Sequence, residues 1–411
     1  MEQNKKQYED IRNPGVLLPT GKLAFVCVFL SLIVCNYLSF GFGMMLPMLK
    51  EDMLAGNRCA GLLSSVSFFT LLIAQLPAAA AAVRLHPKVS MGLSFLCLAG
   101  GCLCHSIASS VWQLVLGRML LAFHICSLGG AVQMLKGEWV PQKKILGINS
   151  AQEFSSNLGH MMGTFFAPLV LSIFLSWRRA SGFCLLAASL IAIIWFCFYR
   201  DIKDCRIKNG DSNIRFFALA IRRKTVRLLA LGWPGAAMIW VAFNSFWPSY
   251  ALDHTALNYS SAGLAVGMIP IGSVAATLAA APLTRLIHRD KLIICGWGAL
   301  LPLFYGATLL TDNLIALCIL FFLAGFSSFA YVPVAMSQLW KLPDFTAPLV
   351  AAGTSLIMLS SNLGSALIGV IYDYLTVNFT QKAALALCCL SPLLWFFSTV
   401  FLPEPEEDIY Q

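Results

Sequence analysis

Long apolar stretches separated by short polar ones make up almost the whole chain. Each stretch is about 20 residues or longer, which is the length that a helix needs to cross the hydrocarbon core of a bilayer. The apolar and polar residues do not alternate as they do in a membrane β-barrel, so the stretches predict helices. Twelve spans are expected, approximately 23–49, 60–83, 89–108, 112–135, 145–175, 180–199, 228–251, 261–286, 292–310, 314–339, 349–375 and 383–402.

The composition agrees with an all-α polytopic membrane protein. The 411 residues are 58% hydrophobic and only 11% charged, whereas roughly a quarter of the residues of a soluble domain are charged. Twelve spans leave no room for a separate soluble module, and neither a phosphate-binding loop nor a metal-ligand cluster is present. We therefore expect no enzyme activity, no cofactor, no metal and no nucleic-acid partner.

The lysines and arginines are distributed unequally between the two sets of loops. With twelve spans, 22 of the 28 basic residues fall in loops on one side and five on the other. By the positive-inside rule, both termini and the central basic segment are predicted to be cytoplasmic. The net charge of +9 thus reflects membrane topology, and the compact chain suggests a bacterial inner membrane.

The two halves of the chain repeat each other at an offset of 205 residues. The pentapeptide Ser-Ser-Asn-Leu-Gly occurs at 155–159 and again at 360–364. The same offset relates four further pairs, Gln133 with Gln338, Lys136 with Lys341, Pro77 with Pro282 and Arg84 with Arg289. Such a duplication predicts two pseudo-symmetric six-helix bundles with a binding site between them. The expected organisation is an N-terminal segment 1–21, a bundle 22–199, a basic linker 200–227, a bundle 228–402 and an acidic tail 403–411.

In its six-plus-six arrangement and its basic linker, the chain resembles the major facilitator superfamily of secondary transporters. The pair Gly117-Arg118 is similar to the helix 4 arginine motif of that family, and 176–179 (Ser-Trp-Arg-Arg) is similar to a turn common in it. The resemblance implies a monomeric transporter that moves a small-molecule substrate by alternating access. The loop at 79–88 departs from the family because it keeps Arg84 and Lys88 but lacks the usual aspartate of the cytoplasmic gate.

One acidic residue, Glu153, lies well inside a predicted span. An embedded charge costs about 2.5 to 3.5 kcal/mol on insertion scales, so it requires a cavity or a partner. Glu153, Asn157, His160 and Thr164 are spaced to form one polar stripe along their helix. The stripe either lines the transport cavity or forms a hydrogen-bonded seam with the other half. In the first case, Glu153 and His160 are candidates for carrying a coupling proton.

Arg118 is the only lysine or arginine well inside a predicted span. A guanidinium can bind a carboxylate or phosphate with two hydrogen bonds, which favours an anionic or zwitterionic substrate. The alternative is a structural role, in which Arg118 clamps the backbone of neighbouring helices or pairs with Glu153.

Further polar and aromatic residues near the middle of the spans complete a candidate binding ring. Trp240, Asn244 and Trp247 share one stripe of the seventh span, and in the resembling family helices 1, 4, 7 and 10 line the path. The alternative is anchoring at the lipid interface, which suits Trp247 better than Trp240. The remaining ring candidates are Asn36, Tyr37, Ser327, Tyr331 and Asn362.

The leading hypothesis is a secondary active transporter that takes up a small organic anion or zwitterion together with a proton. Arg118 would bind the anionic group, the aromatic residues would bind the organic part, and Glu153 with His160 would carry the proton. Two alternatives are a proton-driven exporter of lipophilic compounds and a non-transporting sensor with the same fold. Within the linker, 214–223 is predicted to form an amphipathic helix that contacts anionic membrane lipid.

Overall fold

The computed structural model describes residues 19–52, 57–166, 170, 173–174, 176–199, 213–343 and 345–403. Most of the predicted N-terminal segment, the linker up to residue 212 and nearly all of the acidic tail lie outside these residues. The described elements are α2 (Pro19–Asp52), α3 (Asn57–Arg84), α4 (Pro87–Ser106), α5 (Val111–Trp139), the 3-10 turn η1 (Gln142–Lys144), α6 (Ile145–Phe165), α8 (Trp177–Phe198), α9 (Asn213–Arg222), α10 (Lys224–His254), α11 (Tyr259–Ile287), α12 (Asp290–Ala307), α13 (Leu314–Ala330), α14 (Val332–Lys341), α15 (Ala347–Asn378), α16 (Gln381–Cys388) and α17 (Pro392–Val400).

Within the described residues, every predicted span coincides with helix, and the predicted amphipathic helix of the linker is α9. Ten segments of the described residues are long and apolar enough to cross a membrane. The two remaining predicted spans correspond to α6, which carries the polar stripe, and α12, which begins with Asp290 and Lys291. The polar residues that lower the hydropathy of α6 are therefore the same ones that mark it as a candidate for function.

Two of the predicted spans are each broken into two helices. The span at 314–339 divides at Tyr331 into α13 and α14, and the span at 383–402 divides at 389–391 into α16 and α17. In both cases a proline lies in the first turn of the second piece, Pro333 in α14 and Pro392 in α17. Proline lacks the backbone N–H and its ring clashes with the carbonyl four residues earlier, so a continuous helix is interrupted there.

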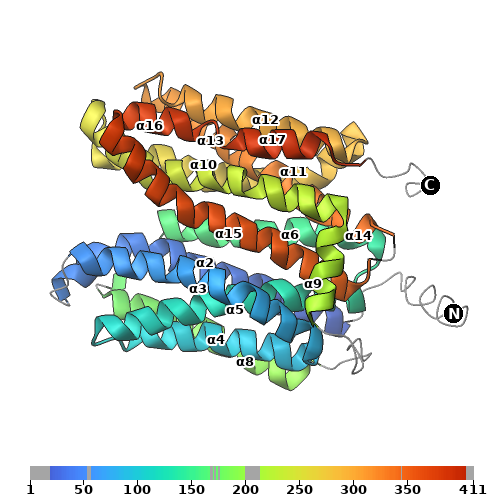
Figure 1. Ribbon diagram of the computed structural model, residues 1–411. Helices are drawn as coiled ribbons and strands as arrows, with labels where there is room; N and C mark the ends of the chain where they lie inside the picture. The colour runs from blue at the N-terminus through green and yellow to red at the C-terminus, as the bar shows by residue number, and fades with distance from the viewer. Residues whose placement is uncertain are drawn as a thin grey trace, which may run out of the picture.

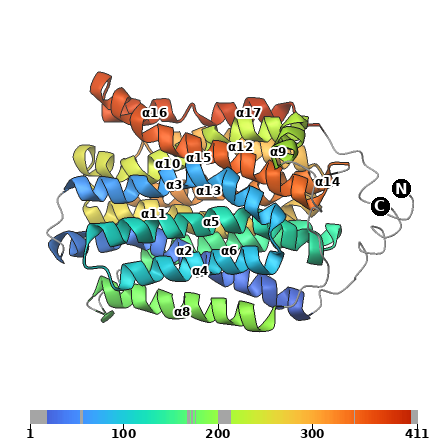
Figure 2. The same cartoon turned by 60° about the horizontal axis from the view of Figure 1, so that its bottom comes forward.

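The helices form two bundles that lie side by side, α2 to α8 in one and α10 to α17 in the other (Figure 1). The bundles meet mainly where α6 packs along α11 and α3 packs along α15 (Figures 1 and 2). One end of the assembly carries α9, α14 and the connection from α5 to α6, and we call it the α9 end. By the distribution of basic residues, this end is the one predicted to be cytoplasmic.

The repeated pentapeptide serves the same packing purpose in both halves. Its glycine in α6, Gly159, lies against α2 so closely that a Cβ atom there would be 2.5 Å from the carbonyl oxygen of Ile33. Its glycine in α15, Gly364, lies against α10, where a Cβ would be 2.7 Å from the carbonyl oxygen of Pro234. Small residues allow helix backbones to approach closely in membranes. The duplication therefore preserves a close helix crossing within each bundle.

Adding a methyl group at this crossing is expected to destabilise the protein. Gly159→Ala should lower the free energy of unfolding by about 2 kcal/mol, because the new Cβ must push α6 away from α2. Gly147→Ala is the matched control on the same helix, since a Cβ there meets no atom within 4 Å, and it should be neutral or slightly stabilising. Thermal unfolding of the two purified variants in detergent checks this, and equal melting temperatures would contradict the close crossing.

Candidate functional site

Four ring side chains from four helices meet between the two bundles. Phe40 of α2 stacks on His160 of α6 with their ring centroids 3.6 Å apart. Trp240 of α10 meets both rings edge-on, at 6.0 Å from Phe40 and 5.6 Å from His160. Phe329 of α13 then contacts Trp240 at 6.3 Å. We call these four residues the central aromatic cluster, and because each bundle supplies two of them, it spans the boundary between the halves.

Polar atoms without partners lie on the helices that supply the cluster. The hydroxyl of Tyr37, the indole N–H of Trp240 and the hydroxyl of Ser327 are buried and have no hydrogen-bond partner in the structure. Buried polar groups are nearly always hydrogen-bonded, so each of these atoms calls for a partner such as a ligand or water. Phe40 is the most exposed member of the cluster, with 36% of its surface accessible, whereas His160 is 6% exposed. Aromatic walls with a few polar groups are the usual lining of a small-molecule site.

The polar side chains along the stripe of α6 make most of their hydrogen bonds to the backbone of the same helix. Asn157 donates a hydrogen bond to the carbonyl oxygen of Glu153 at 3.0 Å, and Thr164 donates to that of His160 at 3.0 Å. His160 reaches the other half through its ring contact with Trp240. The carboxylate of Glu153 is half-buried and makes no hydrogen bond or ion pair among the described residues.

Arg118 is bonded to the backbone of two neighbouring helices. Its guanidinium donates to the carbonyl oxygen of Ser39 on α2 at 3.3 Å and to that of Leu63 on α3 at 3.4 Å. It also lies over the ring of Phe42, 4.6 Å from the centroid, an arrangement that favours a cation. None of these contacts belongs to the central aromatic cluster. The arrangement is that of the structural alternative, a clamp that joins α5 to α2 and α3.

The other predicted ring residues are spread over several environments. Asn36 bonds Ser156 of α6 at 3.2 Å, and Asn244 donates to the carbonyl oxygen of Trp240 at 2.8 Å. Tyr331 is buried against Trp395, with ring centroids 4.5 Å apart, inside the second bundle. Asn362 is half-buried on α15. The structure thus brings Trp240 and His160 together but places Tyr331 against the core of its own bundle.

Two members of the cluster, Phe40 and Phe329, were not predicted from the sequence. The chain contains 29 phenylalanines, so a phenylalanine in an apolar span does not by itself indicate a site. Phe40 lies one turn after the candidate Asn36, and Phe329 lies between Ser327 and Tyr331. Their closeness along the chain to these predicted site residues is the one sequence feature that could have indicated them. Trp247, for which lipid anchoring was considered, is 1% exposed and packs on Phe321, so it is a core residue of the second bundle.

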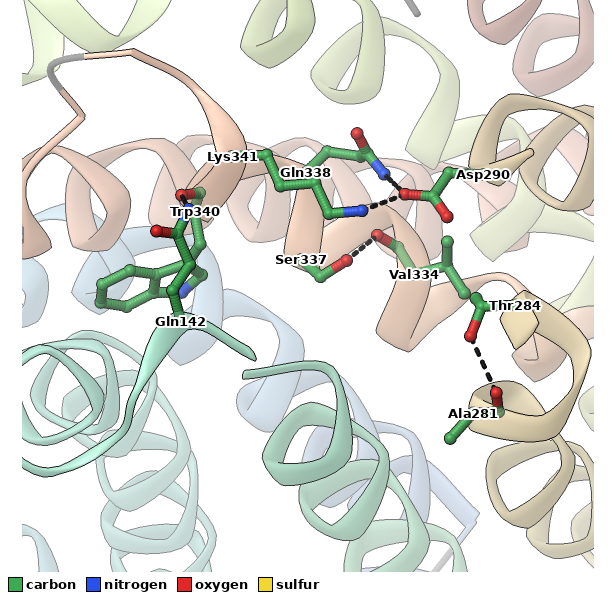
Figure 3. A network of polar contacts seen from close by, with 9 residues as sticks. All are labelled: Gln142, Ala281, Thr284, Asp290, Val334, Ser337, Gln338, Trp340 and Lys341. Atoms are coloured by element: carbon green, nitrogen blue, oxygen red, sulfur yellow. Dashed lines mark hydrogen bonds and ion pairs between the residues drawn. The ribbon is translucent and has the colours of Figure 1, made fainter. Parts of the chain in front are cut away.

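The two bundles are joined at the α9 end by Trp340 of α14 (Figure 3). Its indole N–H donates to the side-chain oxygen of Gln133 on α5 at 3.3 Å. Its carbonyl oxygen accepts from the side chain of Gln142 in η1 at 2.9 Å. Beside it, the apolar residues Val83, Met134 and Ala351 form a small buried cluster between the halves. The α9 end of the boundary is therefore closed.

The sequence profile of the Major Facilitator Superfamily matches residues 28–339, which is most of the chain. This chain belongs to the major facilitator superfamily. Its two six-helix bundles are the fold of these secondary transporters, so the protein is a membrane transporter and not an enzyme. The resemblance inferred from the helix count and the arginine motif is confirmed.

Superfamily members of known structure share the fold over nearly the full length. The transporter FucP in its outward conformation has a TM-score of 0.74 and 13% identity, covering 93% of this chain and 99% of FucP. A second structure, of a single-residue variant of the E. coli fucose:proton symporter FucP, has a TM-score of 0.73 and 14% identity, with 92% and 98% covered. Sugar transport protein 12 of Arabidopsis thaliana is 26% identical over 153 residues, which is 37% of this chain and 30% of that protein.

Proposed function

We propose that this superfamily member is a proton-coupled importer of a small polar organic solute, which binds at the central aromatic cluster. The observation that carries the proposal is the composition of the cluster, because α2 and α6 of one bundle and α10 and α13 of the other contribute one ring each. A solute held there touches both halves. Rocking of the halves about this point would expose the solute first to one side of the membrane and then to the other.

Glu153 is the proposed carrier of the coupling proton. It lies seven residues, or two helical turns, before His160 of the cluster on the same helix. Its carboxylate has no fixed hydrogen-bond partner among the described residues, so protonation does not require a bond to be broken. An embedded carboxylate becomes neutral when protonated, which lowers the cost of moving it through a closed intermediate. His160 stays a second proposed site for the proton.

The contacts of Arg118 favour an uncharged solute over an anion. The guanidinium that was expected to bind an anionic group is bonded to Ser39 and Leu63 instead. The cluster offers aromatic faces and the unpartnered indole N–H of Trp240, a combination that suits a hydroxyl-rich molecule of carbohydrate type. The relatives named as a sugar transport protein and as a fucose:proton symporter support this class.

An organic anion or zwitterion is the second candidate. The first bundle contains the buried cations Arg118 and Lys136 but only one embedded acid, Glu153. This excess of positive charge would favour a substrate that brings a negative charge with it.

Uptake into proteoliposomes tests the function directly. Labelled sugars, polyols, carboxylates and amino acids are supplied outside while the lumen is made alkaline, and accumulation is compared with that at equal pH. Proton-driven accumulation of an uncharged hydroxylated solute is the expected result, and accumulation of carboxylates alone would select the second candidate. Efflux of lipophilic cations would indicate the exporter, and binding without any flux would indicate the sensor.

A substitution at Arg118 separates the clamp from a substrate-binding role. Arg118→Gln is expected to lower the free energy of unfolding by about 2 kcal/mol in the absence of solute, because it removes charged hydrogen bonds to two helices. The apparent affinity for the solute should stay unchanged. Arg179→Gln, at an exposed arginine, is the control and should alter neither quantity. Loss of affinity with unchanged thermal stability would instead assign Arg118 to the solute.

A further inference from the structure

The two halves place equivalent lysines in different surroundings. In the second half, Lys341 forms an ion pair with Asp290, the first residue of α12. Gln338 donates to the same carboxylate oxygen at 2.5 Å, so both side chains converge on Asp290 (Figure 3). The positive charge of Lys341 is thereby balanced by a permanent negative charge within its own bundle.

The first half has the same lysine and glutamine but no such aspartate. Residues 77–110, which include the connection between α3 and α4, contain no acidic residue. The glutamine equivalent to Gln338 is Gln133, and it accepts from Trp340 of the other half. The lysine equivalent to Lys341 is Lys136, which donates to side-chain oxygens of Asn149 at 2.7 Å and Gln152 at 2.8 Å.

Amide oxygens solvate the ammonium group of Lys136 but do not balance its charge. Lys136 is only 1% exposed, and an unbalanced buried charge costs several kcal/mol. Asn149, Gln152 and Glu153 are spaced i, i+3 and i+4, so they lie on one face of α6. Because Lys136 bonds Asn149 and Gln152, Glu153 lies on the face of α6 that this ammonium group contacts. The carboxylate of Glu153 is therefore the counter-charge that the fold provides.

No other charged residue described near this end of α5 is placed to balance the charge of Lys136. Glu138 of α5 accepts a hydrogen bond from Tyr199, which follows the last residue of α8, at 3.3 Å. The helices that pack against α5 are α2, α3, α4 and α15. Their charged residues towards the α9 end are all basic, namely Lys22, Arg84 and Lys88. These residues add positive charge, which strengthens the need for Glu153.

We propose that Lys136 is a positioning residue for proton coupling, because it is the counter-ion that holds Glu153 ready to exchange a proton. This inference rests on the proposed function, in which Glu153 carries the proton. The pair is neutral when Glu153 is ionised and carries one positive charge when Glu153 is protonated. Lys136 is three residues from Gln133, which bonds Trp340 of the other half. Protonation of Glu153 thus changes the net charge of the pair about one helical turn from Gln133, whose contact with Trp340 closes the α9 end.

The test compares the two equivalent lysines in the full-length protein in proteoliposomes. Solute exchange at equal pH on both sides is measured between pH 5 and 9 for Lys136→Met, Lys136→Arg and Lys341→Met. In Lys136→Met the pH of half-maximal exchange should move upward by about 1 to 3 units, because a nearby cation no longer stabilises the ionised form of Glu153. Lys136→Arg should restore the original profile. Lys341→Met should slow exchange without moving the profile.

A second variant keeps the inference testable when Lys136→Met does not fold. Asn149→Asp preserves the shape of the side chain and its acceptor oxygen but adds a negative charge beside Lys136. The new carboxylate would balance the lysine in place of Glu153, so the pH profile should also move upward. Unchanged profiles in the folded Lys136 and Asn149 variants would overturn the inference. The proposed function would still stand if Glu153→Gln prevented accumulation in the same preparation. Normal accumulation by Glu153→Gln would overturn the proposed function itself.

Discussion

Replacing Glu153 by glutamine is expected to abolish accumulation of the solute against its gradient while preserving exchange. Glutamine has nearly the same shape as protonated glutamic acid but can neither take up nor release a proton. The variant should therefore behave as a transporter locked in the protonated state. With a pH gradient imposed, the ratio of internal to external solute should fall to about one, because no free energy is coupled to the movement. Exchange of internal for external solute should stay within about threefold of the unaltered protein.

The informative comparison is with an acid outside the candidate site. Asp373→Asn changes an exposed acidic residue of α15 and should retain both accumulation and exchange. Proton movement recorded with a pH-sensitive dye in the same vesicles should disappear only in Glu153→Gln. Equal loss of accumulation and exchange in Glu153→Gln would assign the residue to folding or solute binding and not to the proton.

Trp340→Ala is expected to open the α9 end of the boundary between the bundles. The substitution removes the ring beside Gly137 and the hydrogen bond to Gln133. Large aromatic residues at the centre of an interface commonly contribute about 2 kcal/mol or more. The balance between closed and open states should therefore shift roughly thirtyfold towards the open one. Hydrogen–deuterium exchange should increase in peptides covering α14 and the beginning of α15.

Two further variants distinguish the ring from its hydrogen bond. Trp340→Phe keeps a ring against Gly137 but loses the N–H donor, so its effect should be about 1 kcal/mol. Trp112→Ala removes a tryptophan that is 73% exposed, and it should leave exchange in α14 unchanged. If Trp340→Ala exchanged hydrogen at the same rate as the unaltered protein, the contact with Gln133 would not contribute to closure.

The candidate site was only partly predictable. Glu153 and His160 stand out in the sequence because a polar stripe in an apolar helix is rare and costly. Phe40 and Phe329 do not stand out, since their significance comes from meeting His160 and Trp240 across the two halves. The partners of Arg118 were equally hidden. They are backbone carbonyl oxygens, which every residue carries, and only the packing of α2 and α3 selects those of Ser39 and Leu63.

The different partners of Lys136 and Lys341 likewise could not be predicted from the sequence. The sequence shows that both lysines recur at one offset and that the first half lacks an aspartate before its third helix. It does not show that Asp290 meets Lys341, or that Lys136 turns to α6. These partners depend on how the helix ends come together, and residues on different helices can be any distance apart for a given separation along the chain.

The sequence by itself determined the membrane class, the positions of the spans and the duplication, because these follow from local hydropathy, from the length of a bilayer-spanning helix and from repeated residues. The tertiary structure alone decided which rings meet between the bundles, that Arg118 bonds the backbone and that Trp340 closes the α9 end. The physical reason is that burial in a bilayer constrains each helix separately, whereas contacts between helices depend on side-chain packing across the whole assembly.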